Sequence, residues 1–177
     1  MKKASSIRTS LLPEDKDKQI QAFNQLKKLY LLDQRNRFPS VPEYGIVSPK
    51  YTDKTSNGLT KCVCDYIRLS GFFCERTSNT GRIIDNRKDV TDCIGRTKTI
   101  GTITRIKSSG TNGTSDLKAI IQGKAVMIEI KCLATGDRIR PDQLRYKLQV
   151  EQAGGIYYIA RDFTSFFDWF NSSFGGI

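Results

Sequence analysis

The fold of this chain is decided by one stretch, Gly113-Thr-Ser-Asp-Leu-Lys-Ala-Ile-Ile-Gln-Gly-Lys-Ala-Val-Met-Ile-Glu-Ile-Lys131. Two apolar runs flank Gln122-Gly123, and a glycine at the second position of a two-residue turn suits a β-hairpin. A turn at this point pairs Ile121 with Lys124. The sequence therefore predicts an antiparallel strand pair in a fixed register.

The two faces of this hairpin differ in chemistry. Counting outward from the turn places Asp116 opposite Glu129, and directly paired residues point to the same face. Lys131 shares that face because side chains alternate along a strand. The other face carries apolar residues that belong in a core, namely Leu117 and Ala119 against Ile128 and Val126.

The composition describes a globular protein. The chain has 177 residues, of which 38% are hydrophobic and 27% charged, enough for one domain with a core plus an appendage. No apolar run approaches the ~18–20 residues of a membrane-spanning helix. The basic N-terminus lacks the apolar core of a signal peptide, so we expect no membrane association and a cytoplasmic protein.

Charge and missing residue types narrow the function further. The 29 Lys and Arg outnumber the 18 Asp and Glu, which gives a net charge of +11. Such charge can serve solubility alone, but its spread along the chain favours a polyanionic partner, DNA above all. The chain contains no histidine, which excludes Ser-His-Asp and Cys-His catalysis and every His-ligated metal site. Its five cysteines suit neither a disulfide framework nor a four-cysteine zinc site.

The rest of the chain divides into an arm and a main domain. Residues 1–54 are expected to form an N-terminal helical arm with a disordered start (1–12), an amphipathic helix (about 14–34) and a proline-rich connector. This arm either packs on the domain or binds a partner. Residues 55–177 are expected to form an α/β domain in the order α-β-β-β-α-β, with helices flanking a mixed central sheet. The first expected elements are a helix capped by Ser56 or Asn57 and closed by Gly71, then a strand at 72–74. Within the polar stretch 77–112 we expect a strand pair around Ile83-Ile84 and residues 99–106. The hairpin follows, then a helix from Pro141 to about Ala153, a strand at 156–160 and an aromatic helix at 165–170.

The polar face of the hairpin suits a hard divalent cation. Two carboxylates, from Asp116 and Glu129, together with the backbone carbonyl of Ile130, offer the oxygen ligands that Mg²⁺ or Mn²⁺ prefers. Such an ion can bind a phosphate oxygen and lower the pKa of a water. Lys131 would hold the attacking water or stabilise negative charge, and Gln143 would orient a water or phosphate. The alternative is an ordinary hairpin whose surface charges form ion pairs.

At these residues the chain resembles the PD-(D/E)xK nuclease superfamily, and most of all its VRR-NUC and Holliday-junction-resolvase-like branch of phage and prophage proteins. The motifs that carry the resemblance span about residues 55–170. They are Gly113-Thr-Ser-Asp116, Ile128-Glu-Ile-Lys131, Gln143 with Tyr146, and Ala153-Gly-Gly-Ile-Tyr-Tyr-Ile159.

The resemblance implies a restriction-endonuclease-like core and a Mg²⁺- or Mn²⁺-dependent deoxyribonuclease. Asp116 and Glu129 would bind the metal, Lys131 would be the catalytic lysine and Gln143 would assist in the active site. Ser115 stands where the superfamily name has proline. The first helix carries Asn57 and Lys61 at the turn where a glutamate often contributes, so the number of metal ions, one or two, stays open. The residues expected to contact DNA are Arg76, Arg82, Lys107, Ser115, Arg140 and Tyr146.

Two functions therefore remain for the chain. The first is a structure-specific DNA endonuclease in phage DNA processing, acting in the host cytoplasm if phage-encoded. Symmetric cleavage of a junction would require a homodimer. The second is a catalytically silent DNA-binding or packaging-associated protein on a nuclease fold. A weaker hypothesis is RNA binding through base stacking on Tyr157 or Tyr158.

Overall fold

The structure is a computed structural model that describes residues 13–77, 81–106 and 110–175. The expected disorder of residues 1–12 and the expected DNA contact of Lys107 lie outside these ranges. The helices are α1 (Pro13–Arg37), η1 (Glu43–Gly45), α2 (Ser56–Leu69), η2 (Leu133–Thr135), α3 (Pro141–Gln152) and α4 (Phe163–Phe174). The strands are β1 (Phe73–Arg76), β2 (Arg82–Asp85), β3 (Lys88–Thr91), β4 (Thr97–Ile100), β5 (Ile103–Ile106), β6 (Leu117–Ile121), β7 (Lys124–Ile130) and β8 (Ile156–Ala160).

A mixed sheet with the strand order β1-β6-β7-β8 forms the centre of the protein. The β1–β6 and β6–β7 pairs are antiparallel, and β7–β8 is parallel, with α3 as the crossover between them. The predicted register is confirmed, because Ile121 pairs with Lys124 and Leu117 with Ile128. The chain is thus a mixed α/β protein, as expected.

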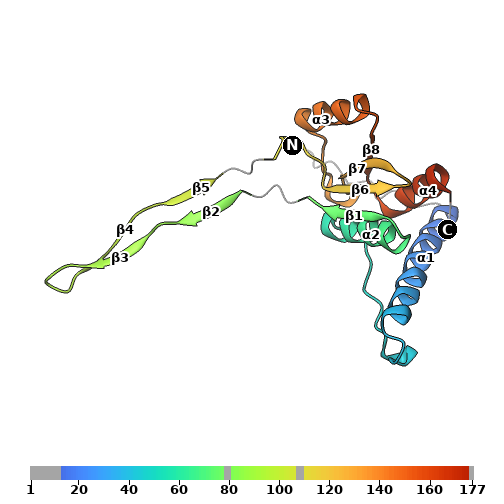
Figure 1. The fold of residues 1–177 in the computed structure, drawn as a ribbon, viewed down its shortest axis with the longest axis horizontal. Helices are drawn as coiled ribbons and strands as arrows, with labels where there is room; N and C mark the ends of the chain where they lie inside the picture. Colours follow the sequence, from blue (N-terminus) through green and yellow to red (C-terminus); the bar gives the residue numbers. More distant parts are fainter. Residues whose placement is uncertain (1–12, 78–80, 107–109, 176–177) are drawn as a thin grey trace, which may run out of the picture.

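The helices lie on both faces of this sheet (Figure 1). The α2 and α4 helices cover one face, where the alternating residues of β6 and β7 are buried, as predicted for the apolar side of the hairpin. Tyr66 of α2 and Phe166 and Phe170 of α4 contribute the largest rings to this core. The α3 helix lies over the opposite face and contacts β8. That opposite face therefore keeps its polar side chains under α3.

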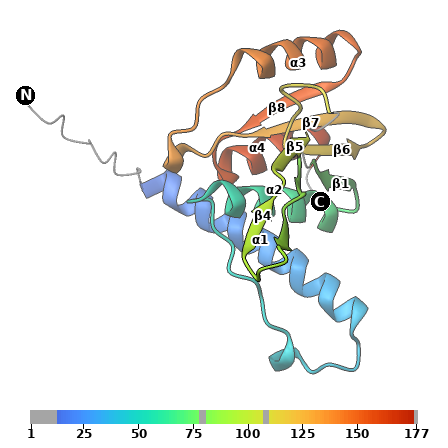
Figure 2. The same ribbon diagram turned by 90° about the vertical axis from the view of Figure 1, so that its left-hand side faces the viewer.

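The α1 helix belongs to the same core. It contacts α2 and α4 (Figure 2), and both Ala22 and Leu26 are fully buried in the core cluster. The Phe23 ring lies 5.1 Å from the ring of Phe163 in α4. Of the two roles considered for residues 1–54, packing against the domain is the one that α1 adopts.

The α2 helix begins one residue earlier than expected. Thr55, not Ser56 or Asn57, is its N-cap, because the Thr55 side chain accepts a hydrogen bond from the Gly58 amide at 3.1 Å. Thr55 has the extended backbone that an N-cap requires, whereas Ser56 is already helical. The expected closure at Gly71 is confirmed by its positive φ of 85°.

The polar segment between β1 and β6 forms a long two-stranded ribbon, here called the ribbon (residues 82–106). The β2–β5 and β3–β4 ladders follow one another along it, and both are exposed throughout almost their whole length. Figure 1 shows it extending away from the sheet and helices. The expected strand pair is thus present, but it is longer than predicted and stands apart from the main sheet.

Candidate active site

The turn between β6 and β7 sets the geometry of the site. Gln122 and Gly123 have φ values of 49° and 76°, the pair of positive angles that a tight two-residue hairpin requires. The resulting register brings Asp116, the residue before β6, beside β7. The Ile130 amide donates a hydrogen bond to Asp116 Oδ2 at 3.0 Å. In a strand the N–H and C=O of one residue point to the same side, so the Ile130 carbonyl also faces Asp116.

Glu129 and Lys131 lie buried beside each other, as the alternation of β7 predicted. Lys131 Nζ is 3.1 Å from Glu129 Oε1 and 3.4 Å from Oδ2 of Asp137, a residue that follows η2. Only 2% of the Glu129 side chain and 4% of the Lys131 side chain are exposed. Glu129 and Lys131 therefore do not form the solvated surface ion pair that is the alternative to a functional site.

Gln143 connects this pair to α3. Its side-chain oxygen accepts a hydrogen bond from the Arg140 amide at 2.9 Å, which satisfies a free donor at the helix N-terminus. Its amide nitrogen donates to Glu129 Oε1. Gln143 is 9% exposed, so its two hydrogen bonds form a buried link between α3 and β7.

The second oxygen of Glu129 has no hydrogen-bond partner among the described residues. Oε1 receives the amide of Gln143 and the ammonium of Lys131, whereas Oε2 is buried without a hydrogen bond in the described part of the chain. The hydroxyl of Tyr157, on the neighbouring strand β8, is likewise buried without a hydrogen bond of normal geometry there, although it lies close enough to Glu129 for that carboxylate to raise the pKa of the phenol. A buried carboxylate oxygen without a partner costs free energy and calls for a cation or a water.

The electrostatics of Glu129 agree with this geometry. Burial, and after it the nearby charge of Asp116, raise the pKa of Glu129 to about 7 against the opposing effect of the Lys131 ammonium. Burial raises the pKa of the Tyr157 phenol most, and the charges of Glu129 and Asp116 raise it further. Two carboxylates are thus held together with too little positive charge between them. A divalent cation would reverse this balance.

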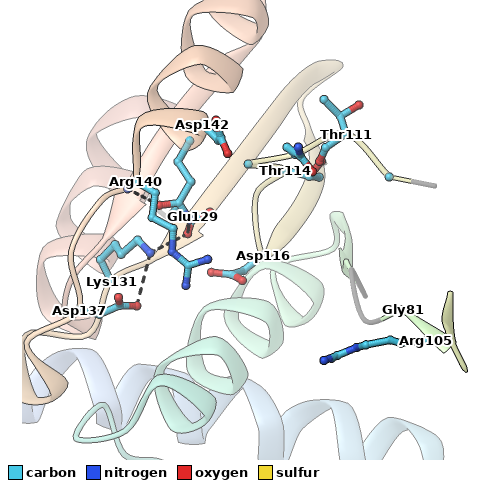
Figure 3. A pocket seen from close by; sticks show the side chains of 14 residues that line it. Gly81, Arg105, Thr111, Thr114, Asp116, Glu129, Lys131, Asp137, Arg140 and Asp142 are labelled. Atoms are coloured by element: carbon cyan, nitrogen blue, oxygen red, sulfur yellow. Dashed lines mark hydrogen bonds and ion pairs between the residues drawn. The ribbon is translucent and has the colours of Figure 1, made fainter. Parts of the chain in front are cut away.

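These groups line one cavity of about 620 Å³ (Figure 3). In the figure Asp116, Glu129 and Lys131 converge on it, with Arg140 and Asp137 at its side. The glycine- and threonine-rich loop before Asp116 forms another wall, and Arg105 reaches the cavity from the base of the ribbon. The described lining residues are Gly81, Arg105, Gly110, Thr111, Asn112, Gly113, Thr114, Asp116, Glu129, Lys131, Asp137, Arg140, Asp142 and Gln143.

Gly113 lets this loop lie directly on the start of α3. Its φ is +78°, and a Cβ at this position would lie 2.3 Å from the carbonyl oxygen of Asp142. Only glycine fits such an approach between two backbones. Asp142, in the first turn of α3, forms an ion pair with Arg145 one turn later.

The residues expected to contact DNA have different surroundings. Arg140 lines the cavity, and Arg82 is exposed at the base of the ribbon. Arg76 is exposed and donates to the side-chain oxygen of Asn57 at 2.9 Å. Tyr146 is partly buried, with its ring 6.2 Å from the Tyr157 ring.

The expectation for Ser115 is wrong. Ser115 is fully buried, and its hydroxyl donates to the Leu117 carbonyl at 3.0 Å, so its side chain cannot reach DNA. The residue supports the turn into β6 instead. The stacking considered for the two tyrosines also fails, because Tyr158 is already stacked on Trp169 at 4.0 Å and Tyr157 is 9% exposed.

Sequence reasoning missed three residues of the site, Asp137, Arg105 and Tyr157. Asp137 and Arg105 come from a loop and from the ribbon, whose positions no periodicity predicts. Tyr157 could have been found, because the parallel pairing places it beside Met127, two residues from Glu129 on the same face. Within the described residues no cluster of three or more Asp, Glu, Cys or His side chains is placed to hold a metal ion. Asp116 and Glu129 would therefore need the Ile130 carbonyl and water to complete a coordination shell.

None of the helices described here combines the length and the apolar character needed to cross a membrane. The chain matches no protein-family model and no curated protein.

Proposed function

We propose that this protein is a metal-dependent DNA endonuclease that hydrolyses phosphodiester bonds, of the PD-(D/E)xK type and its VRR-NUC or junction-resolvase-like branch. The observation that carries the proposal is the convergence of Asp116, Glu129 and Lys131 in one cavity. Both carboxylates approach the same point of β7, and the only buried lysine among the described residues stands beside them.

The order of the elements supports a restriction-endonuclease-like core. The α2 helix precedes the antiparallel strands β1, β6 and β7, and α3 crosses to the parallel strand β8. This is the α-β-β-β-α-β order expected from the sequence, with the ribbon inserted after β1. The site lies where β7 ends and α3 begins.

The donor set fits Mg²⁺ or Mn²⁺. Asp116, Oε2 of Glu129 and the Ile130 carbonyl are the oxygen atoms that would hold the ion, and Oε2 is the buried atom that lacks a partner among the described residues. When bound, the ion would neutralise phosphate charge and make a water more acidic. Gln143 and Lys131 both engage Oε1, so Oε2 is the Glu129 oxygen that remains available.

The remaining residues of the cavity have roles that follow from their charge. Lys131 keeps its ammonium in the cavity through Glu129 and Asp137, where it can donate a hydrogen bond to a phosphate oxygen or orient a water. Arg140 and Arg105 line the same cavity and can bind the flanking phosphates. The glycine-rich wall leaves room for a sugar–phosphate backbone to approach.

A catalytically silent DNA-binding or packaging-associated protein is the second candidate. One observation favours it: Asn57 of α2 bonds to Arg76 and offers no carboxylate to the site. This function predicts salt-dependent DNA binding without metal-dependent cleavage. A cytoplasmic location suits either function, and symmetric cleavage of a four-way junction would further require a homodimer.

Cleavage of a DNA panel separates the two candidates. Wild type, Asp116→Ala and the control Glu151→Ala, on the exposed side of α3, would be incubated with plasmid, linear duplex, flap and four-way junction in Mg²⁺, Mn²⁺ or EDTA. The nuclease proposal expects metal-dependent cleavage by wild type and the control, and none by Asp116→Ala. Equal DNA binding by all three without any cleavage would establish the silent function instead.

A further inference from the structure

The ribbon has an unbroken register, which defines its two faces. In both ladders the numbers of paired residues add to the same total, as in Arg82 with Ile106 and Lys88 with Ile100. The Asn86 amide donates to the Thr102 carbonyl between the ladders, in the same register. Residues counted by twos from Arg82 therefore share one face along the ribbon.

Within the strands, one of these faces carries cations and apolar side chains but no acid. We call it the basic face. It consists of Arg82, Ile84, Asn86, Lys88 and Val90 on one strand, and of Lys98, Ile100, Thr102, Thr104 and Ile106 on the other. Ile100 and Ile106 are 50% and 49% exposed there. Asp92, the next residue in this register, lies in the turn, where its carboxylate accepts hydrogen bonds from the Ile94 and Arg96 amides.

The opposite face neutralises its own charge. Asp85 pairs with Arg87 at 2.7 Å, and Asp89 accepts a hydrogen bond from the Thr99 hydroxyl at 2.6 Å. Both acids in the ribbon strands thus lie on this face. This separation of charge follows from the alternation of residues along the strands. Within the strands of the ribbon, no acid therefore lies on the same face as Arg82, Lys88 and Lys98.

A two-stranded ribbon without a core is marginally stable in water by itself. Its exposed β-branched side chains therefore indicate that a partner covers them. Three cations among them indicate that this partner is a polyanion.

We infer that the basic face of the ribbon docks in the major groove of a DNA duplex that extends from the cavity. The major groove is about 12 Å wide and admits a two-stranded ribbon. From Arg82 to Thr91, at about 3.3 Å per residue, the ribbon is about 30 Å long, close to one helical turn. Arg82, Lys88 and Lys98 contact phosphates, and the apolar side chains between them contact base edges and thymine methyl groups.

The base of the ribbon reaches the candidate active site, which gives this docking a function. Arg105 and Gly81 line the cavity, so a duplex held by the ribbon lies next to Asp116 and Glu129. The inference rests on the proposed function for the identity of the ligand. Duplex RNA is a poorer fit, because its major groove is deep and narrow.

Binding of a fluorescent duplex, measured by anisotropy in EDTA at several salt concentrations, tests the inference. The variant Arg82→Gln/Lys88→Gln/Lys98→Gln is expected to lower the slope of log K against log salt by about 2.7, at about 0.9 for each phosphate contact. The control Lys16→Gln/Lys27→Gln/Lys28→Gln removes the same charge from exposed positions on α1 and should leave the slope within about 0.5 of wild type.

A second pair of variants separates the two faces at constant charge. Ile100→Thr/Ile106→Thr changes the basic face, and Ile83→Thr/Ile103→Thr changes residues of the other face that are at least as exposed. Only the first pair should weaken duplex binding, by about tenfold or more, because threonine buries less apolar surface against the bases than isoleucine does. Circular dichroism and Mn²⁺ affinity would show that each variant keeps its fold and its site.

Three results would overturn the inference. The first is an equal loss of duplex affinity for the variants of both faces. The second is an equal loss of affinity for duplex RNA by the basic-face variants. The third is an unchanged DNA affinity of the basic-face variants together with a loss of self-association, which would make this face a contact between copies. The outcome is separable from that of the nuclease proposal. Wild type that binds through the basic face but never cleaves disproves only the nuclease, whereas cleavage with unaltered binding by the basic-face variants disproves only the docking.

Discussion

Glu129→Gln should stabilise the metal-free protein at alkaline pH while abolishing the proposed metal site. Glu129 is 2% exposed, and burial together with the charge of Asp116 raises its pKa from 4.5 to about 7. The folded state therefore binds this proton more tightly than the unfolded state does. Stability from this group is fully present below about pH 4.5 and is lost as the pH rises through about 7.

The size of the effect follows from that pKa. The full difference corresponds to about 3 kcal/mol at 1.36 kcal/mol per tenfold change in proton affinity. The cavity admits solvent, which screens the charges, so we expect about 1.5–2 kcal/mol. Glutamine reproduces the uncharged side chain at every pH. The variant should thus unfold about 3–8 °C above wild type at pH 8, given ~2–4 °C per kcal/mol for a chain of this size.

Thermal unfolding in EDTA at pH 4.5 and at pH 8, for both proteins, measures this difference. The two should unfold together at pH 4.5 and separate at pH 8. If the proposed metal site exists, adding Mn²⁺ at pH 8 should raise the melting temperature of wild type alone, because the variant lacks the Glu129 carboxylate. A variant that is less stable than wild type at pH 8, or shifted equally at both pH values, would refute the reasoning.

Three further substitutions test other parts of the structure. Gln143→Ala removes the hydrogen bond to Glu129 and should weaken Mn²⁺ binding 10–100-fold, as measured by calorimetry. Gln149 is exposed on the same helix, and Gln149→Ala should leave Mn²⁺ binding unchanged. Gly113→Ala places a Cβ 2.3 Å from the Asp142 carbonyl oxygen and should cost about 2–3 kcal/mol in urea unfolding. Gly123→Ala has a similar φ but open space and should cost about 1 kcal/mol, so equal losses would argue against the close approach. Leu26→Ala should cost about 2–5 kcal/mol if α1 is part of the core, against at most about 0.5 for the exposed Leu32→Ala.

The parts of the site that lie on one hairpin could be predicted from sequence. A two-residue turn fixes the register, and the alternation of strands then places Asp116, Glu129 and Lys131 on one face. The prediction that Gln143 would join them came from its place at the start of the next helix and from the resemblance, and the structure shows it hydrogen-bonded to Glu129.

The parts of the fold that depend on contacts between distant segments could not be predicted. Asp137 reaches Lys131 from an irregular loop, and Phe23 of α1 packs on Phe163 of α4, which lies far along the chain. A polar residue after a glycine-rich loop, such as Ser115, is expected at the surface. Its hydroxyl is instead satisfied inside the turn by the Leu117 carbonyl, a local bond that composition does not reveal.

The ribbon is another part of the fold that the sequence predicts only in outline. Neither of its faces has a regular apolar pattern, so the sequence predicts a strand pair there without its length or its register. The two faces are defined by the register, in which Arg82 pairs with Ile106, and this register is seen only in the structure.

The most direct test of the central claim is the rate of cleavage of a four-way junction and of its component duplex in Mn²⁺. Wild type would be compared with Lys131→Ala and with Lys124→Ala, an exposed lysine at the start of the same strand. The proposed function predicts metal-dependent cleavage by wild type and Lys124→Ala, and its loss in Lys131→Ala with DNA binding retained. Cleavage by Lys131→Ala at the wild-type rate, or none by any of the three, would contradict it.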